Sequence, residues 1–473
     1  DKARLVGYSA KEAWVSAMMR MVSGFLAKEV FPPLVNRYKE KDTKLEAMSS
    51  WIYLIDNIVG FDKQMQSLIT SETQFFSFGN DRLHVDSRGS SVLDIFYDRP
   101  GWLKIWAKVE LKDAWKKLKS ELTDEKAWSI RKDAGVDMLV GMESDQFPLS
   151  SKEAHKAPTI AQSAIKIAWE MVERCQTLPS VVLRAQFIRS TTVKFFWYFI
   201  NVLVLRRKND VFPSDNTDED LVKISALINS AGYVNSKLQE WSDDVDFLEM
   251  RIAEKERDAT PDPGNLKDSC FFREEIKSLM DLETSLLMEI IAVLLRNIEV
   301  ISWDYLQNNG SFIHDEAALT SDGVTTNINE AISFSLAQAL DAMRSQLQLL
   351  KTNLNPKDFL DLWRSVAEGL DHFISSSIFE YDIRFSAAGI NQFRVDMRAL
   401  FLVFRSFCTR PESFFPCIRE TLKLLNSSTD EVKSMVAVLN NERSNSGCLL
   451  HIGISHLSFD QVYKALRNRK FDP

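Results

Sequence analysis

The strongest constraint on this chain is a run of apolar residues that recur every three or four positions between residues 217 and 256. The run comprises Ile224, Ile228, Ala231, Val234, Leu238, Trp241, Val245, Leu248 and Ile252. This spacing places these side chains on one face of an α-helix. A single helix of about 35 residues would be roughly 50 Å long, because each residue adds about 1.5 Å. Such a length does not fit within one compact globule, and it predicts a rod.

A polar, proline-containing stretch at 256–269 interrupts this pattern, and a second long apolar helix is predicted from Phe272 to Tyr305. These two helices could pair in an antiparallel manner. Residues 308–326 are predicted to form a loop, and the order of both connecting stretches is left open. Further helices follow, one of them starting at Asn355-Pro356, with the asparagine as its N-cap.

The pattern contains no convincing strand pair and no fixed repeat period, so the sequence predicts an all-α fold built as an elongated stack of helical bundles. We expect a first bundle region at 1–150, a central bundle with long helices at 151–310 and a C-terminal bundle at 311–473. The composition agrees, because thirty Phe and eleven Trp accompany only 16 Gly and 13 Pro among 473 residues. Aromatic-rich, glycine-poor chains suit packed helices better than turn-rich β-structure.

Local signals predict where several helices begin and end. Ser9 and Glu12 have capping-box spacing, as do the stretches at 428–431 and 458–461. The first helix is expected to bury the apolar stripe of Trp14, Met18, Met21, Phe25 and Leu26. It is expected to stop at Phe31-Pro32-Pro33, because proline has no N–H to donate and disfavours helix in the residue before it.

Charge and cysteine content exclude several classes of protein. The net charge of −8 argues against a nucleic-acid partner, because phosphate binding needs a clustered basic face, and none is evident in the sequence. Five scattered cysteines without a C-x-x-C pair indicate a reducing compartment, with neither a disulfide framework nor a zinc site. The apolar run at 193–207 is too short for a transmembrane segment and contains Lys194, so we expect a buried helix there.

The chain begins with Asp1 and shows no signal-peptide pattern. We therefore expect a processed protein or the C-terminal part of a longer one. Part of the function would then reside in a region that precedes these residues.

A search for catalytic chemistry finds no nucleotide-binding glycine loop, no H-E-x-x-H motif and no G-x-S-x-G motif. The alternative to a non-catalytic protein is an all-α, magnesium-dependent prenyl-diphosphate enzyme, since Asp243, Asp244 and Asp246 form an acidic cluster. Their D-D-x-D spacing differs from the D-D-x-x-D of such enzymes, and no second magnesium motif follows. The helical wheel also directs Asp243 and Asp246 away from the face of Trp241 and Val245. We expect no cofactor and no metal.

The stretch "AAGINQFRVDMRALFLVF" at 387–404 mixes charged residues with many apolar ones. Its apolar residues form one helical stripe of Ile390, Phe393, Met397, Leu400, Phe401 and Phe404. Arg394, Asp396 and Arg398 are predicted to lie on the flanks or the back of that helix and to pair with neighbouring helices. No partner for acid–base catalysis lies nearby in sequence, so the stretch is interpreted as part of a core.

Residues 374–404 resemble the C-terminal signature of the RINT/TIP family of tethering subunits of the endoplasmic-reticulum Dsl (NRZ) complex, nearest to its plant MAIGO-type members. The matching residues follow a G-x-x-Q-F-x-x-D-x-x-x-L-F pattern and are Gly389, Gln392, Phe393, Asp396, Leu400 and Phe401. The stretches at 61–65, 92–118 and 459–471 also resemble this family. None of these motifs is a reaction signature.

The resemblance implies CATCHR-type helical bundles, as in the exocyst and Golgi tethering complexes, and a non-catalytic role in capturing Golgi-derived vesicles at the endoplasmic reticulum. It implies a cytoplasmic protein on the periphery of that membrane, with endoplasmic-reticulum SNARE proteins and other tether subunits as partners. The family's N-terminal helical segment, which pairs with the next subunit, is not recognised here. For the SNARE contact we select aromatic and basic residues of a short helix near the C-terminus, namely Phe459, Tyr463, Arg467, Arg469 and Lys470.

Overall fold

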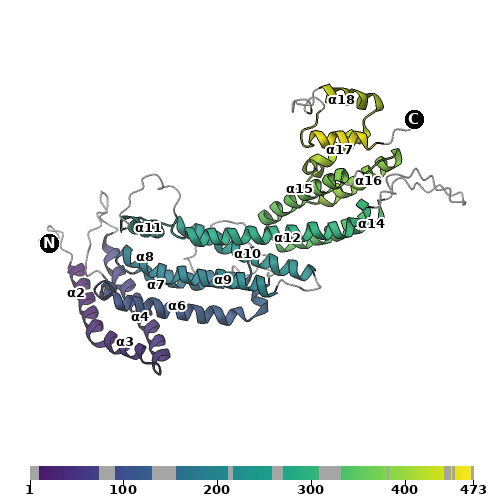
Figure 1. Cartoon of the computed structure of the whole chain (residues 1–473). Helices are drawn as coiled ribbons and strands as arrows, with labels where there is room; N and C mark the ends of the chain where they lie inside the picture. Colours follow the sequence, from purple (N-terminus) through teal and green to yellow (C-terminus); the bar gives the residue numbers. More distant parts are fainter. Residues whose placement is uncertain are drawn as a thin grey trace. The chain divides into compact units, whose positions relative to one another are not determined.

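The computed structural model describes residues 10–73, 91–129, 156–210, 217–257, 270–307, 332–380, 383–441, 449 and 453–469. Within these ranges the regular structure is helical, and the only β-type pairing is one isolated bridge between Phe385 and Arg469 (Figure 1). The all-α prediction is confirmed. The chain forms two compact units: residues 1–213 with 226–284, and residues 214–225 with 285–473.

The first unit is built from helices that pack side by side, with α6 in contact with α4, α7, α8 and α9, and with α8 in contact with α11 (Figure 1). Its elements are α2 (Ala10–Phe25), the π-helical turn η1 (Leu26–Val30), α3 (Phe31–Lys39), α4 (Lys44–Thr73), η2 (Val92–Asp94), α5 (Ile95–Asp98), α6 (Pro100–Leu122), η3 (Glu125–Trp128), α7 (Thr159–Gln176), α8 (Val181–Ser190), α9 (Thr192–Asp210) and α11 (Val245–Arg257). Two further helices, α10 (Thr217–Ser242) and α12 (Arg273–Gln307), contribute residues to both units. The 35-residue α12 confirms the second long helix expected from the sequence.

Aromatic rings form the core of the first unit. Phe31 contacts Phe96 with ring centroids 5.7 Å apart, Phe96 contacts Trp106 at 5.1 Å, and Trp106 contacts Phe187 at 4.4 Å. These four side chains are fully buried. Rings from α3, α5, α6 and α8 therefore make one continuous apolar path, which explains the high aromatic content of the sequence.

The α9 helix supplies part of this core and coincides with the segment tested as a membrane span. Phe195, Phe196, Phe199 and Leu203 are fully buried, whereas Trp197 and Leu205 are exposed. The helix therefore has one face in the core, as predicted. In the part of the chain that is described, no helix has both the length and the apolar character needed to cross a bilayer.

The N-terminal helix differs from the sequence prediction in two ways. Pro32 and Pro33 occupy the first turn of α3 instead of ending a helix, because first-turn positions have no intrahelical partner for their N–H groups. The expected buried stripe lies mostly outside, with Trp14 53%, Met21 64% and Phe25 59% exposed. The buried residues of α2 are Val15 and Met19, on a different face. Ser9 of the predicted capping box lies outside the described residues.

The single helix predicted for 217–256 is also wrong, because the chain breaks at Asp243 and Asp244. The Asp244 carboxylate accepts the N–H of Asp246 at 2.9 Å and so caps a new helix, α11. This break rotates the face that is buried. Val245 is 67% exposed, while Phe247 is almost fully buried.

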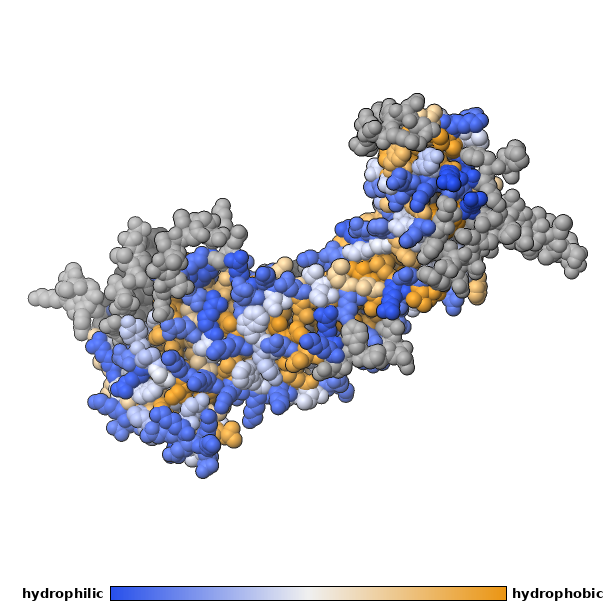
Figure 2. All heavy atoms as spheres, viewed as in Figure 1, coloured by the Kyte–Doolittle hydropathy of each residue, from blue (hydrophilic) through white to orange (hydrophobic). Residues whose placement is uncertain are grey.

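The second unit contains α14 (Phe334–Asn353), α15 (Pro356–Glu380), α16 (Ala387–Phe404), η5 (Pro411–Phe414), α17 (Pro416–Asn426), α18 (Thr429–Asn441) and α20 (Phe459–Arg467). Helix α16 packs on α14 and α17, and α20 packs on α17 and α15. The predicted helix start at Pro356 is confirmed. In both units the surface seen in Figure 2 mixes hydrophobic residues with a majority of hydrophilic ones.

Candidate functional site

The apolar residues of the family-like motif form the core of the second unit, as predicted. Ser386 caps α16 by accepting the N–H of buried Gly389 at 3.1 Å. Phe393 is 1% exposed and contacts the Phe385 ring at 5.6 Å, and Phe401 contacts the Phe415 ring at 5.1 Å. Leu400 is buried beside them. These side chains hold α16 in place and are not available to a ligand.

Asp396, predicted to lie on the flanks or the back of the helix and to pair with neighbouring helices, is fully buried and does pair with a neighbouring helix. Its Oδ1 accepts the Ser333 N–H at 2.9 Å, and its Oδ2 accepts the Ser333 hydroxyl at 2.7 Å. Gln392 Nε2 donates to the same carboxylate at 3.0 Å. The two polar motif residues therefore fix the start of α14 on α16 across 63 residues of chain.

Burial raises the pKa of the Asp396 carboxyl above its ordinary value, although the hydrogen bonds from Ser333 and Gln392 oppose that rise. Burial also raises the pKa of Tyr305, and the neighbouring Asp396 raises it further. A carboxylate that accepts several hydrogen bonds in a closed core has no path to a substrate. The motif is a structural device, which agrees with its interpretation as part of a core.

Four of the five residues selected for partner binding lie in or directly after α20, the last helix among the described residues. The predicted capping box is present, with Ser458 accepting the Gln461 N–H and Gln461 accepting the Ser458 N–H. Tyr463 is 41% exposed, Arg467 is exposed and Phe459 is partly exposed. They follow one another at intervals of four residues, so they share one side of the helix. We call Phe459, Tyr463 and Arg467 the α20 face.

Arg469 does not join this face. Arg469 donates from Nη1 to the Ser427 carbonyl at 2.6 Å and to the Leu424 carbonyl at 3.5 Å, so it satisfies the C-terminal end of α17. Burial lowers the pKa of Arg469. Lys470 lies outside the described residues.

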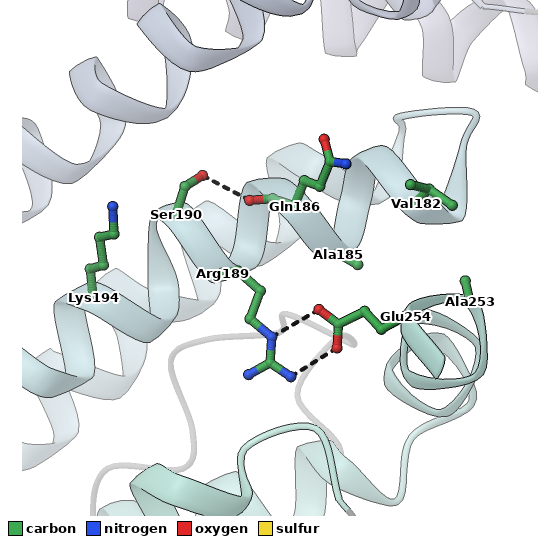
Figure 3. Close-up of a pocket in the computed structure, with 8 residues that line it drawn as sticks. All are labelled: Val182, Ala185, Gln186, Arg189, Ser190, Lys194, Ala253 and Glu254. Atoms are coloured by element: carbon green, nitrogen blue, oxygen red, sulfur yellow. Dashed lines mark hydrogen bonds and ion pairs between the residues drawn. The ribbon is translucent and has the colours of Figure 1, made fainter. Parts of the chain in front are cut away.

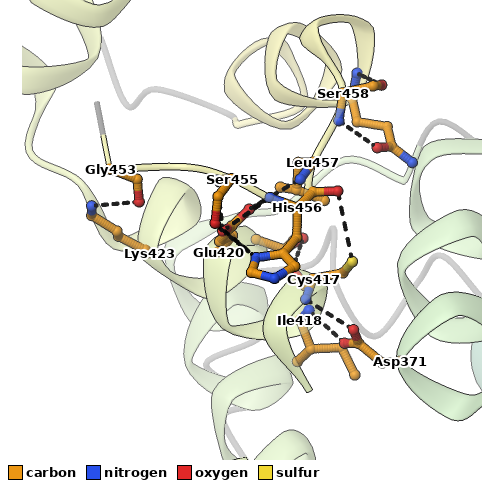
Figure 4. Close-up of polar contacts among 12 residues, drawn as sticks. Asp371, Cys417, Ile418, Glu420, Lys423, Gly453, Ser455, His456, Leu457 and Ser458 are labelled. Carbon is orange, nitrogen blue, oxygen red and sulfur yellow. Dashed lines mark hydrogen bonds and ion pairs between the residues drawn. The ribbon is translucent and has the colours of Figure 1, made fainter. Parts of the chain in front are cut away.

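A carboxylate that the sequence analysis did not single out positions the segment before α20 (Figure 4). Glu420 of α17 accepts the backbone N–H groups of Ser455 at 2.9 Å, His456 at 3.0 Å and Leu457 at 3.0 Å. It also binds His456 Nδ1 at 3.0 Å. Burial opposes ionisation, but the hydrogen bonds from His456, Ser455 and Leu457 lower the pKa of Glu420. Glu420 and Arg469 together fix α20, and so the α20 face, on α17.

A second buried carboxylate anchors α17 itself. Asp371 of α15 is 4% exposed and accepts the N–H groups of Cys417 at 2.9 Å and Ile418 at 2.8 Å (Figure 4). These groups belong to the first turn of α17, where donors have no intrahelical partner and the helix dipole favours a negative charge. Asp371 therefore joins α15 to α17, and Glu420 joins α17 to the segment before α20. Together these contacts link the core helix α15 to the α20 face.

A family model for the RINT-1/TIP-1 family matches residues 14–469. The chain belongs to this family.

Two curated relatives support that membership. The RINT-1/TIP-1 chain is 32% identical over 441 residues, 92% of its length, to the RINT1-like protein MAG2 of Arabidopsis thaliana. It is 24% identical over 219 residues, 46% of its length, to the RINT1-like protein of Drosophila melanogaster. The matches cover 52% and 28% of those proteins, so the chain spans about half of the first and less of the second.

The fold of the RINT-1/TIP-1 chain is similar to that of a solved subunit of the Dsl1 complex. The crystal structure of the SNARE Sec20 bound to the Dsl1 complex subunit Tip20 matches with a TM-score of 0.56 and 14% identity, over 98% of this chain and 78% of that one. At this identity the similarity concerns the fold. It agrees with the CATCHR-type helical architecture that the family resemblance implied.

The acidic cluster behind the enzyme alternative does not form a metal site. Asp243 is exposed, Asp244 caps α11, and Asp246 pairs with Arg184 at 3.4 Å and with Gln176 at 3.3 Å. Asp246 therefore contacts α7 and α8 instead of facing solvent as predicted, because α11 is rotated relative to α10. Among the residues that the structure describes, no three potential ligands gather in a way that could hold a metal ion.

A groove of about 760 Å³ lies in the first unit between α8, the start of α9 and α11 (Figure 3). Arg189 and Glu254 form a bidentate pair across it at 2.9 and 2.8 Å. The Arg189 guanidinium also lies over the Phe271 ring, 4.0 Å from its centroid. Lys194 lies apart from this pair in the figure, so the charges do not converge on one point. The groove therefore lies where α8 and α11 meet, and the ion pair between Arg189 and Glu254 joins these two helices.

Proposed function

We propose that this RINT-1/TIP-1 chain is part of a non-catalytic vesicle-tethering subunit in Golgi-to-endoplasmic-reticulum retrograde transport, and that it binds the N-terminal cytosolic region of an endoplasmic-reticulum SNARE. Family membership supports the proposal. The similarity in fold to Tip20, a Dsl1 complex subunit that has been crystallised with the SNARE Sec20, supports the kind of partner. Other Dsl/NRZ-type tether subunits are proposed as further partners. The protein would act in the cytoplasm, on the periphery of the endoplasmic reticulum.

The SNARE contact is assigned to the α20 face, and the single observation that carries this assignment is its anchoring. Tyr463 and Arg467 are exposed, yet the helix that bears them is fixed by Glu420 and Arg469. A rigid surface loses little conformational entropy on binding. Tyrosine and arginine are also the residue types that contribute most to protein interfaces.

Calorimetry with the whole chain and the cytosolic region of each endoplasmic-reticulum SNARE tests this assignment. The double substitution Tyr463→Ala with Arg467→Glu is expected to weaken binding by on the order of tenfold to a hundredfold, because it removes two anchor side chains. Both side chains are exposed, so the melting temperature is expected to stay unchanged.

The matched control is Tyr53→Ala with Arg398→Glu, which makes the same chemical changes at two exposed positions away from α20. This control is expected to bind as tightly as the wild type. Equal loss in both variants would place the contact elsewhere. An intact chain that binds none of the SNARE proteins would contradict the proposal for these residues.

A further inference from the structure

A row of lysines runs along α6 in the first unit. Lys104, Lys108, Lys112 and Lys116 recur at intervals of four residues, and all four are exposed. Four residues make slightly more than one helical turn, so each ammonium group follows the last by about 6 Å along the axis and about 40° around it. The lysine row therefore covers about 18 Å of length and about a third of the helix surface.

The carboxylates of the described residues do not neutralise this row. Asp113 and Glu170 bind Lys117, which is outside the row, at 3.1 Å each. Within the described part of the chain, no salt bridge involves Lys104, Lys108, Lys112 or Lys116. Like charges at this helical spacing are destabilising in isolation. The four lysines gather positive charge on one helix of a chain whose net charge is −8, and an external anion would neutralise it.

The start of α4 adds to the same positive region. Partial burial, together with the nearby ammonium groups of Lys44 and Lys108, lowers the pKa of Lys112. Lys44 itself lies over the Tyr38 ring, 5.0 Å from its centroid. Leu45, the next residue along α4, is 78% exposed. An exposed apolar residue next to a lysine is a feature of protein surfaces that contact lipid headgroups.

We propose that the lysine row is a docking surface for a membrane with anionic lipid headgroups. The residue type favours a lipid surface over an acidic protein segment. Lysine carries a hydrated point charge on a flexible stem, which suits a diffuse field of anions, whereas recognition of individual carboxylates uses the planar fork of arginine. All four positions of the row are lysine. The surface would let the chain contact a bilayer directly, and it does not depend on the SNARE contact.

Flotation of the whole chain with vesicles tests the proposal without any SNARE. The chain is expected to float with vesicles of phosphatidylcholine containing about a third phosphatidylserine and to stay behind with phosphatidylcholine alone. Replacing all four lysines by glutamine is expected to lower the partition coefficient at least tenfold, because each lysine near an anionic surface contributes to binding. Raising the salt concentration from about 0.1 M to about 0.5 M is expected to weaken binding of the wild type in the same direction.

The matched control replaces Lys166, Lys255, Lys277 and Lys357, four exposed lysines that form no row, by glutamine. It changes the net charge equally and is expected to float like the wild type. Equal losses in the two variants would overturn the proposal in favour of a net-charge effect. Failure of the wild-type chain to bind anionic vesicles would also overturn it. If the chain instead bound a poly-glutamate peptide, with the same sensitivity to the four substitutions, the surface would be one for an acidic protein segment.

Discussion

Glu110 of the first unit and Asp371 of the second are both buried, but they hold their surroundings in different ways. In the first unit, Glu110 is 1% exposed and binds other side chains, namely Trp106 Nε1 at 2.9 Å and Arg174 Nη1 at 3.1 Å. In the second unit, Asp371 and Asp396 accept backbone N–H groups at the starts of helices. A side-chain partner can move with its acid, whereas a backbone partner fixes a whole helix. Asp371 and Asp396 therefore fix the starts of helices in the second unit, as Asp62 does for η2 in the first by accepting the Val92 N–H at 3.1 Å. Glu110 instead adds side-chain hydrogen bonds to a core of packed aromatic rings.

The largest expected effect that tests this comparison is the removal of an aromatic ring from the first unit. Trp106→Ala is expected to lower the free energy of unfolding by about 3–5 kcal/mol, because it leaves a cavity between Phe96 and Phe187. Chemical denaturation measures the loss. The control Tyr53→Ala removes a ring that is 73% exposed and is expected to change stability by less than about 0.5 kcal/mol.

A second variant separates packing from hydrogen bonding at the same position. Trp106→Phe keeps a six-membered ring at this position, but it removes the N–H that donates to Glu110 together with the smaller part of the ring volume. If packing dominates the first unit, this variant should retain more than half of the stability that Trp106→Ala loses. An equal loss in the two variants would show that the buried acid, and not the ring, holds these helices together.

The sequence predicted the helical class and the motif helix well, for a physical reason that the other helices make clear. The apolar stripe of α16 is buried as expected, since Phe393, Leu400 and Phe401 have no competing apolar face. Helix α2 carries two apolar faces, and periodicity alone cannot say which one packs. There the prediction chose the side of Trp14 and Met21, which lies outside.

The polar contacts of the candidate site could not be predicted, because their partners are far apart in the sequence. Asp396 binds a residue 63 positions away, and Glu420 binds residues 35 to 37 positions away. The break at Asp243–Asp244 was missed because the apolar spacing continues through it, although an aspartate before a new turn is a known cap signal. The four-residue spacing of the lysines in α6 can be seen in the sequence. It was not singled out because the basic character was judged from the net charge of the whole chain, which is negative.

A smaller effect is expected from the backbone-directed carboxylate of the second unit. Asp371→Ala is expected to lower the free energy of unfolding by about 2 kcal/mol, because two N–H groups at the start of α17 lose a charged acceptor. Asp371→Asn keeps one acceptor oxygen and should lose less. The control Asp361→Ala, at an exposed position of the same helix, is expected to be nearly neutral. Equal losses for Asn and Ala would mean that the charge, and not the geometry, is what α17 requires.

The smallest expected effect is a dependence of stability on pH, and it distinguishes two carboxylates within the second unit. Hydrogen bonds to the charged form hold the pKa of Glu420 below its ordinary value, so the folded state binds fewer protons than the unfolded state. The stabilisation from Glu420 is therefore fully present above the unfolded pKa of about 4.3 and is lost as the pH falls through the lower folded value.

Asp396 has the opposite shift, so its ionisation costs stability as the pH rises, and this cost is relieved in acid. Thermal melts between about pH 6 and pH 3 test both shifts. The difference in stability between the wild type and Glu420→Gln should shrink as the pH falls. Over the same range the wild type should become more stable relative to Asp396→Asn. A gap for Glu420→Gln that stays constant with pH would show that its contacts to Ser455, His456 and Leu457 do not depend on the charge, and that the segment before α20 is fixed by packing alone.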